Sequence, residues 1–163
     1  MEWGKASFEF QVSSFEKMQK ERAVLQVKRL VPSAVLPTVA HRGQDLGYDL
    51  YAAESIVIPA RGMEKVKTGI AIEFTSGHGA LLRDRSSMAS KGLAVTAGVI
   101  DAGYRGEIQV IMHNLGESDF AINAGDKIVQ MIPVKPETHF PVEEVAELTE
   151  TVRGANGFGS TGK

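Results

Sequence analysis

The stretch EKVKTGIAIEF, residues 64–74, sets its larger apolar side chains at even-numbered positions, at Val66, Ile70, Ile72 and Phe74. Successive side chains of a β-strand point to opposite faces, so this spacing predicts one strand that turns a single face to a core. The same period of two recurs along the chain and favours a fold made of strands. Strands are expected at 24–31, 55–60, 64–74, 79–85, 107–114 and 127–134.

Turn signals separate these strands, because Gly, Pro, Asn, Asp and Ser gather in the segments PARG, TSGHG, NLGES and NAGDK. Short strands with a turn about every ten residues are typical of all-β proteins. No helical segment of about 10–15 residues alternates with the strands, which disfavours a doubly wound parallel sheet. The expected fold class is therefore all-β, with a jelly-roll-like β-barrel or sandwich.

Length and composition indicate one ordinary globular domain. The chain has 163 residues, of which 43% are hydrophobic and 23% are charged, enough to bury one core. A formal net charge of −2 gives no electrostatic reason to expect a nucleic acid or an anionic membrane as partner. There is no cysteine, and no stretch reaches the roughly 20 apolar residues that span a bilayer. We therefore expect a soluble, cytoplasmic protein.

The two ends of the chain differ from its middle. Residues 1–22 lack the period of two, and helix-forming residues at 13–23 favour one short helix. Residues 143–163 become acidic and then Gly-rich, and such a segment is usually mobile unless something binds it. The expected organisation is an N-terminal extension at 1–22, a β domain at 23–142 and a C-terminal arm at 143–163.

The C-terminal stretch GFGSTGK, residues 157–163, matches the first positions of the phosphate-binding P-loop signature. A P-loop needs a strand before it and a helix after it, and this sequence offers no helix there. The Gly, Ser and Thr residues can still present backbone N–H groups and hydroxyls to an anion. Arg153 adds a planar guanidinium, and Phe158 adds a face on which a base can stack. The alternative interpretation is an unstructured Gly-rich tail.

Two internal segments carry side chains suited to phosphate chemistry. In RDRSSMASKG, residues 83–92, the guanidinium of Arg85 and the hydroxyls of Ser86 and Ser87 could clamp a phosphate. Asp101 lies between an apolar run and a Gly-Tyr-Arg-Gly turn. As a carboxylate at a buried edge it could orient a water as general base, or it could cap a turn through backbone hydrogen bonds.

Two further polar residues stand among apolar neighbours. Asp49 lies between two aromatic residues at the start of a strand, where it could hold a water of Mg²⁺ or a structural arginine. Gln130 could reflect surface alternation or a ligand contact. The four histidines show no metal-ligand spacing, so a zinc site built by the protein is not expected.

Taken together and in this order, five segments closely resemble the five motifs of the trimeric deoxyuridine triphosphate nucleotidohydrolases (dUTPases). They are GYDLYAAE (47–54), RDRSSMASKG (83–92), GVIDAGYRGE (98–107), GDKIVQM (125–131) and RGANGFGSTG (153–162). The third and fifth segments are the most diagnostic. The resemblance covers most of the chain, and residues 1–22 lie outside it.

This resemblance implies a jelly-roll-like fold and a homotrimer whose three active sites lie at subunit interfaces, with each C-terminal arm closing over a neighbour's substrate. The implied reaction is hydrolysis of dUTP to dUMP and pyrophosphate, with Mg²⁺ held chiefly by the triphosphate. Such a reaction keeps uracil out of DNA and supplies dUMP for thymidylate synthesis.

The resemblance also implies roles for single residues. Asp101 would orient the water that attacks the α-phosphorus, and Tyr104 would lie under the deoxyribose and exclude a 2′-hydroxyl. Backbone groups at Gly98 and Ile100, with a β-hairpin that follows them, would read the uracil. Asp49 would reach the metal through water.

The remaining substrate contacts are implied by the second, fourth and fifth segments. Arg85, Ser86 and Ser87 from a second subunit would contact the phosphates, together with Gln130. Arg153, Ser160 and Thr161 would bind the γ-phosphate. Phe158 and Gly159 would lie over the uracil ring.

Five residues depart from the family's usual pattern without removing a proposed catalytic group. Asp84 stands where a small residue or Pro is usual, Ser87 where Gly is common, Gly103 where Asp is common, Lys127 where Arg is common and Asn156 where Gly is common. Two alternative functions stay open. One is a dCTP deaminase, or a bifunctional deaminase and dUTPase of the same fold, which needs a Glu acid/base near the pyrimidine that no segment here matches. The other is a nucleotide-sensing regulatory protein in which residues 1–22 serve a partner.

Overall fold

The computed structural model describes residues 24–155, so the helix expected at 13–23 lies outside the described residues. The strands of this part are β1 (Leu25–Arg29), β2 (Tyr48–Tyr51), β3 (Ile56–Ile58), β4 (Met63–Lys67), β5 (Ile70–Phe74), β6 (Gly79–Asp84), β7 (Leu93–Thr96), β8 (Val99–Ile100), β9 (Gln109–Asn114), β10 (Phe120–Ile122) and β11 (Lys127–Val134), with the short helix α2 (Ser86–Ala89) between β6 and β7. Among residues 24–155, no helix has the length and apolar composition that a membrane crossing needs.

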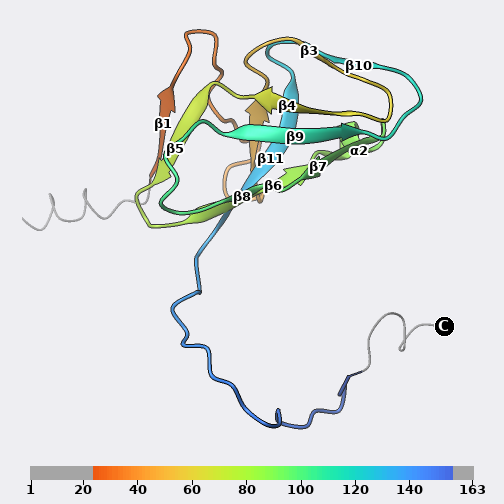
Figure 1. Ribbon diagram of the computed structural model, residues 1–163. Coiled ribbons are helices and arrows are strands. Elements are labelled where there is room, and N and C mark those ends of the chain that lie inside the picture. The colour runs from red at the N-terminus through yellow and green to blue at the C-terminus, as the bar shows by residue number, and fades with distance from the viewer. Residues whose placement is uncertain (1–23, 156–163) are drawn as a thin grey trace, which may run out of the picture.

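Every strand pair within residues 24–155 is antiparallel, and these pairs form four small sheets around one core (Figure 1). The largest sheet has the order β2-β11-β6-β8, and a second sheet has the order β4-β9-β7. The pairs β1-β5 and β10-β3 complete the walls. The expected all-β, jelly-roll-like sandwich is confirmed.

The core follows from the alternation within the central strands. In β9, Val110 and Met112 are fully buried while their neighbours along the strand are partly exposed. In β11, Ile128, Val129 and Met131 are fully buried. Burying one such side chain stabilises a fold by about 1.5–3 kcal/mol, so these two strands anchor both large sheets to one core.

The single strand expected at 64–74 is wrong, because the structure has two strands there. Thr68 and Gly69 separate β4 from β5, and Gly69 has a φ of 67°, in the left-handed region that favours glycine. β4 pairs with β9, whereas β5 pairs with β1, so the chain changes sheets at this point. The apolar alternation continues through the break, which is why the pattern alone indicated one strand.

A second change of sheet lies at Ala97 and Gly98, whose φ angles are 60° and 81°. Before this corner β7 pairs with β9, and after it β8 pairs with β6. In the ladders of the described strands, β8 and β9 are not partners. The hairpin expected after Ile100 is therefore wrong, because the chain between β8 and β9 crosses from one sheet to the other.

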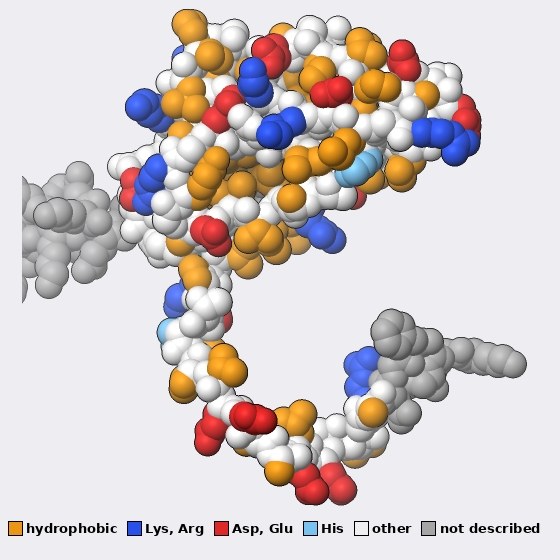
Figure 2. Space-filling model, viewed as in Figure 1, with side chains coloured by type: hydrophobic (Ala, Val, Ile, Leu, Met, Phe, Trp, Pro, Cys, Tyr) orange, Lys and Arg blue, Asp and Glu red, His pale blue; other side chains and the backbone are white. Residues whose placement is uncertain are grey.

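Beyond β11 the chain leaves the body as an arm, and residues 135–155 contain no strand or helix (Figure 1). Every residue of this part is exposed, including the large apolar side chains of Phe140, Val142 and Leu148. Apolar and acidic side chains are spread along the arm (Figure 2). The body of the same chain therefore gives these apolar groups no burial.

Gly69→Ala is expected to lower the free energy of unfolding by about 3 kcal/mol, through a conformational cost and a packing cost. A left-handed conformation costs an L residue about 1–2 kcal/mol. The new Cβ would also lie 2.6 Å from Val31 Cγ2 and 2.9 Å from Ala34 Cβ. Urea unfolding at a fixed protein concentration measures the loss.

Gly77→Ala is the matched control for this substitution. Gly77 has a φ of 71°, and a Cβ there would have no neighbouring atom within 4 Å. It should therefore show the conformational cost alone. Equal losses in the two variants would contradict the packing role of Gly69.

Candidate active site

A hollow of about 210 Å³ lies beside the corner between β7 and β8. Four residues expected in a substrate site line it together, namely Gly98, Ile100, Asp101 and Tyr104. The rest of the wall was not expected from the sequence and consists of Ala97, Val99, Glu107, Gln109 and Ile111.

One signal for the missed part of the wall was available in the sequence. Glu107, Gln109 and Ile111 occupy alternate positions at and just before β9, while Val110 and Met112 point into the core. Once β9 is placed, a period of two puts these three side chains on its outer face, next to the motif that precedes it.

The Ala97–Gly98 corner, which forms one wall of the hollow, is strained. Ala97 is a non-glycine residue at a φ of 60°, a conformation that costs an L residue about 1–2 kcal/mol. Gly98 also has a left-handed backbone conformation, and a Cβ there would lie 3.0 Å from Leu82 O. The carbonyl of Gly98 accepts a hydrogen bond of 2.7 Å from the Leu82 amide, which fixes the corner to β6. Backbone strain held in this way tends to gather at functional sites.

A tight turn after β8 carries Asp101 and Tyr104. The Tyr104 amide donates to Asp101 O at 3.0 Å, and the Tyr104 hydroxyl donates to Glu107 O at 3.0 Å. These two bonds lay the tyrosine ring across the turn, along the path toward β9.

The Asp101 side chain was expected at a buried edge, and in this chain it is exposed. Within residues 24–155 no hydrogen bond or ion pair engages its carboxylate. An ionised carboxylate accepts hydrogen bonds only, and this one is free to accept them from a water or a ligand at the rim of the hollow.

The other carboxylate of the wall, that of Glu107, is already engaged. Glu107 Oε1 accepts a bond of 2.9 Å from the Gly69 amide, and Oε2 accepts one of 3.0 Å from Gln109 Nε2. Both oxygens therefore hold the wall together, and they tie it to the Gly69 corner.

A second group of charged side chains lies at the far end of the β2-β11-β6-β8 sheet. Arg85 Nε donates to Asp49 Oδ1 at 3.0 Å, and Lys127 Nζ lies 2.9 Å from Asp49 Oδ2. Arg85 Nη1 also donates to Lys127 O at 3.1 Å. The Asp49 side chain is only 13% exposed, so one carboxylate is held between two cations. Of the two roles expected for Asp49, a water of Mg²⁺ or a structural arginine, the structure therefore shows the contact with an arginine.

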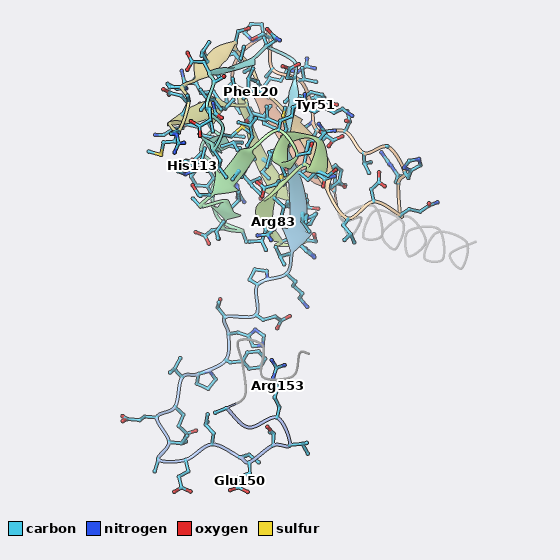
Figure 3. The ribbon with its side chains drawn as sticks, turned by 90° about the vertical axis from the view of Figure 1, so that its right-hand side faces the viewer. Tyr51, Arg83, His113, Phe120, Glu150 and Arg153 are labelled. Atoms are coloured by element: carbon cyan, nitrogen blue, oxygen red, sulfur yellow. The ribbon has the colours of Figure 1, made fainter. Side chains whose placement is uncertain are left out.

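The hydrogen bond to Asp49, with attraction to the same carboxylate, raises the pKa of Lys127 above its ordinary value. Lys127 is therefore charged at neutral pH, and the ring of Tyr51 lies 5.9 Å from its Nζ. Figure 3 shows Tyr51 and Arg83 on strands of this sheet. The group formed by Asp49, Arg85 and Lys127 carries one net positive charge, which suits an anionic ligand.

Ser86, Ser87 and Gln130 lie next to this charged group. Arg85 precedes α2 with an extended backbone, so the serines open the helix directly beside the guanidinium. Arg85 Nη1 lies 3.4 Å from Ser87 Oγ. Gln130 is partly buried on β11, where it pairs with Asp49 on one side and with Arg83 on the other.

Asp101 and the charged group lie far apart within one chain. The backbone of Asp101 lies against Gly79 at the start of β6, whereas Arg85 follows the end of that strand. Six residues of extended chain span about 20 Å. The guanidinium of Arg85 points toward β2, which is farther from β8 still.

The C-terminal segment is only partly described. Arg153 lies on the arm, away from the sheets (Figure 3). The expected contacts of Phe158, Gly159, Ser160 and Thr161 lie outside the described residues.

An all-antiparallel sandwich with a hollow beside a free carboxylate, and with a separate cationic group, defines an all-β protein equipped for a small anionic ligand. The chain belongs to the dUTPase family, whose model matches residues 33–162.

Named relatives agree with this assignment. The chain is 46% identical over 141 residues to the deoxyuridine 5′-triphosphate nucleotidohydrolase of Clostridioides difficile, covering 85% of this chain and 97% of that one. It is 47% identical over 152 residues to the enzyme of that name from Oryza sativa subsp. japonica, covering 90% of this chain and 85% of the relative.

Solved structures of dUTPases share the fold. A variant of the Staphylococcus bacteriophage 80alpha dUTPase with dUpNHpp superposes with a TM-score of 0.79 at 29% identity, covering 86% of this chain and 99% of that one. A dUTPase variant from phage phi11 of S. aureus, described with a structural Mg(II) ion, gives a TM-score of 0.70 at 28% identity, covering 78% of this chain and 99% of that one.

Asp49→Asn is expected to lower the free energy of unfolding by about 1.5–3 kcal/mol, the contribution of a charge-assisted hydrogen bond. The substitution keeps the shape of the side chain but leaves Arg85, whose side chain is 24% exposed, without a counter-charge. Chemical denaturation measures the change.

Glu54→Gln is the matched control, because the Lys67–Glu54 pair is about half exposed on both sides. An exposed pair contributes about 0–1 kcal/mol. A loss in Asp49→Asn no larger than in Glu54→Gln would show that the charged group does not stabilise the sheet.

Proposed function

We propose that this protein hydrolyses dUTP to dUMP and pyrophosphate, which keeps uracil out of DNA and supplies dUMP for thymidylate synthesis. The observation that carries the proposal is the hollow in which the free Asp101 lies beside Tyr104 and the Ala97–Gly98 corner, in a member of the dUTPase family. In the proposed organisation, residues 1–22 form an extension, 23–142 the catalytic β domain and 143–163 an arm. The enzyme is placed in the cytoplasm.

Asp101 is assigned the role of general base. Its carboxylate accepts a proton of one water, whose oxygen forms a bond to the α-phosphorus. The bond from that phosphorus to the bridging oxygen breaks, and pyrophosphate leaves with the electron pair. The proton then passes from Asp101 to solvent, which returns the residue to its ionised form. The exposed and unpartnered state of this carboxylate in the single chain supports the assignment.

Uracil and deoxyribose are assigned to the hollow. Backbone groups at Gly98 and Ile100 read the uracil edge, and a mismatched base would leave buried polar groups unpaired. Tyr104 lies under the sugar and excludes a 2′-hydroxyl. The hydrogen bond from the Tyr104 hydroxyl to Glu107 O supports a fixed position for this ring.

The triphosphate is assigned to the charged group and to the arm. Arg85, Ser86, Ser87 and Gln130 bind phosphate oxygens, and Arg153, Ser160 and Thr161 bind the γ-phosphate, while Phe158 and Gly159 cover the uracil. Closing an arm over the substrate excludes bulk water and leaves one positioned nucleophile.

Magnesium fits this site as an ion carried by the nucleotide. Among residues 24–155 no group of three or more His, Asp or Glu side chains could hold a metal. The two oxygens of Asp49 already accept from Arg85 and Lys127, but a carboxylate offers about four acceptor positions. Asp49 therefore retains room for a water of the hydrated ion. When bound, Mg²⁺ would neutralise charge on the triphosphate and stabilise the pyrophosphate leaving group.

The distance of about 20 Å between Asp101 and Arg85, from six residues of extended chain, favours a site built from two subunits. One triphosphate cannot touch both residues of the same chain. In a closed ring of identical chains, the hollow of one subunit meets the charged group of the next. The exposed apolar side chains of the arm, such as Phe140 and Leu148, gain burial on a neighbour. A homotrimer with exchanged arms is therefore part of the proposal.

A pyrophosphate-release assay across dUTP, dTTP, dCTP and UTP tests the reaction and its specificity. The wild-type chain should turn over dUTP far faster than the other three. Asp101→Asn should still bind dUTP but lose at least about 100-fold in kcat, the usual contribution of a general base. Asp119→Asn, which alters a carboxylate that caps the Ala60 amide in a distant turn, is the control. Turnover of Asp101→Asn within a few-fold of wild type would contradict the assigned role.

Subunit mixing tests the shared site. Asp101→Asn and Arg85→Ala should each be nearly inactive, and refolding them together should restore about a quarter of wild-type turnover. Each site then needs an intact Asp101 from one chain and an intact Arg85 from its neighbour, and each condition is met about half the time. No recovery in verified mixed oligomers would place both residues in one chain's site.

Removal of the arm after Thr151 tests the closing segment. The truncated chain should keep its fold and oligomeric state, because it retains Phe140 and Leu148 and because residues 152–155 are exposed. Its kcat should fall by at least about 100-fold, because the γ-phosphate contacts and the cover over the uracil are lost. Full activity in the truncated chain would contradict the closing role.

One observation favours the deaminase alternative enough to be tested. Glu107 does lie in the wall of the hollow, although the sequence showed no matching segment. Both of its oxygens are engaged by Gly69 and Gln109, which opposes a role in proton transfer. Ammonia release from dCTP at a rate comparable with pyrophosphate release from dUTP would establish the alternative.

A further inference from the structure

The turn that carries Asp101 and Tyr104 receives little support from strands. Between the end of β8 and Ile108, its one backbone–backbone hydrogen bond to the described part of the chain is the bond from Tyr104 N to Asp101 O. Gly103, at the centre of the turn, has no side chain, and a Cβ there would have no neighbouring atom within 4 Å. Nothing at this position restrains the turn from within, so its shape depends on other groups.

Arg105 supplies that restraint. Its Nη1 donates to Ala102 O at 2.8 Å and to Tyr104 O at 2.9 Å, the two carbonyls on either side of Gly103. One guanidinium nitrogen therefore bridges the turn across its most flexible residue. The direction of the Tyr104 ring and the position of Asp101 both follow from these carbonyls.

Glu73 holds the guanidinium in place. Its Oε1 accepts a bond of 2.7 Å from Arg105 Nη2. Glu73 lies within β5, opposite Gln26 of β1, so its backbone is fixed by a strand pair and not by the turn. The chain of contacts thus runs from a rigid sheet, through Glu73 and Arg105, to the catalytic turn.

We propose that Arg105, held by Glu73, is a positioning residue that sets the geometry of Asp101 and Tyr104 for dUTP hydrolysis. The proposal rests on the proposed function. Both side chains are nearly half exposed, and an exposed ion pair contributes little to stability. Misplacing a catalytic group by about 1 Å, however, can cost about 100-fold in rate. The effect of the pair lies in the rate and not in the stability of the fold.

Kinetics of Arg105→Ala and Glu73→Gln test the proposal. Arg105→Ala should lower kcat by about 10–100-fold while the unfolding midpoint stays close to that of wild type. Glu73→Gln keeps an acceptor oxygen and should show a smaller loss. Glu117→Gln is the matched control, because Glu117 pairs with Arg61 on an exposed surface that lies outside the hollow. Wild-type kcat in Arg105→Ala would overturn the proposal, as would an equal loss in Glu117→Gln.

Chemical rescue separates positioning from general damage. Adding guanidinium chloride at millimolar concentrations should restore kcat of Arg105→Ala in a saturable manner, because the free cation can bridge the same two carbonyls. Sodium chloride and urea at equal concentrations should not. Equal effects of all three additives would show that the arginine has no specific role at the turn.

Hydrogen exchange gives a readout that does not depend on turnover. The Tyr104 amide, which donates to Asp101 O, should exchange at least about tenfold faster in Arg105→Ala and should be unchanged in Glu117→Gln. If the wild-type protein does not hydrolyse dUTP but the Tyr104 amide still exchanges faster in Arg105→Ala, the proposed function is wrong and the restraint of the turn by Arg105 is supported. If the wild type hydrolyses dUTP normally but the exchange of the Tyr104 amide is unchanged in Arg105→Ala, only the restraint of the turn by Arg105 is overturned.

Discussion

Left-handed backbone at Gly69 and at Gly98 is the constraint on which the rest of the structure depends. At each corner the chain leaves one sheet and enters another, so residues of different sheets become neighbours. The Gly69 amide binds Glu107, whose second oxygen accepts from Gln109, and the Glu107 carbonyl accepts from Tyr104. A backbone corner therefore sets the wall of the hollow, and a Cβ at Gly69 would disturb both packing and the site.

Two carboxylates of this chain show how environment assigns roles. Asp49 is partly exposed and lies between two cations, where its charge joins β2, β11 and the end of β6. Asp101 has no partner among the described residues and faces the rim of the hollow. Carboxylates in such different surroundings are suited to different purposes: Asp49 joins strands, whereas Asp101 is free to accept hydrogen bonds from a water or a ligand. In the proposed site, Asp101 of one chain acts with the Arg85 group of another, because about 20 Å of extended β6 separates Arg85 from the turn that carries Asp101.

Much of the fold follows from the period of two, which fails where strands are short and where the chain turns within an unbroken apolar pattern. Alternation located β6, β9 and β11 closely, because each buries one face against the core. It missed the break at Gly69, since a change in φ alters the direction of the chain without altering the order of apolar residues. It did not predict the short strands β7, β8 and β10, and a hairpin was expected after Ile100 where the chain instead crosses between sheets. Motif resemblance predicted Asp101 and Tyr104 in one site, and the hollow brings them together. It did not predict Glu107 in the wall, although the period of two in β9 indicates its face, and it could not predict the contacts of Arg105, which depend on the distant strand β5.

Gly103 and Arg105 are best understood as one unit. Where an aspartate is common in the family pattern, Gly103 removes the side chain that could restrain the turn from within. A glycine loses more conformational freedom on folding than any other residue, so the turn needs an external restraint to hold one shape. The two carbonyls that flank Gly103 are the groups that Arg105 binds, and Glu73 fixes the arginine to a paired strand. The restraint from Arg105 and Glu73 therefore acts at the position where this chain departs from the motif. The rate of the reaction consequently depends on a surface contact that lies outside the wall of the hollow.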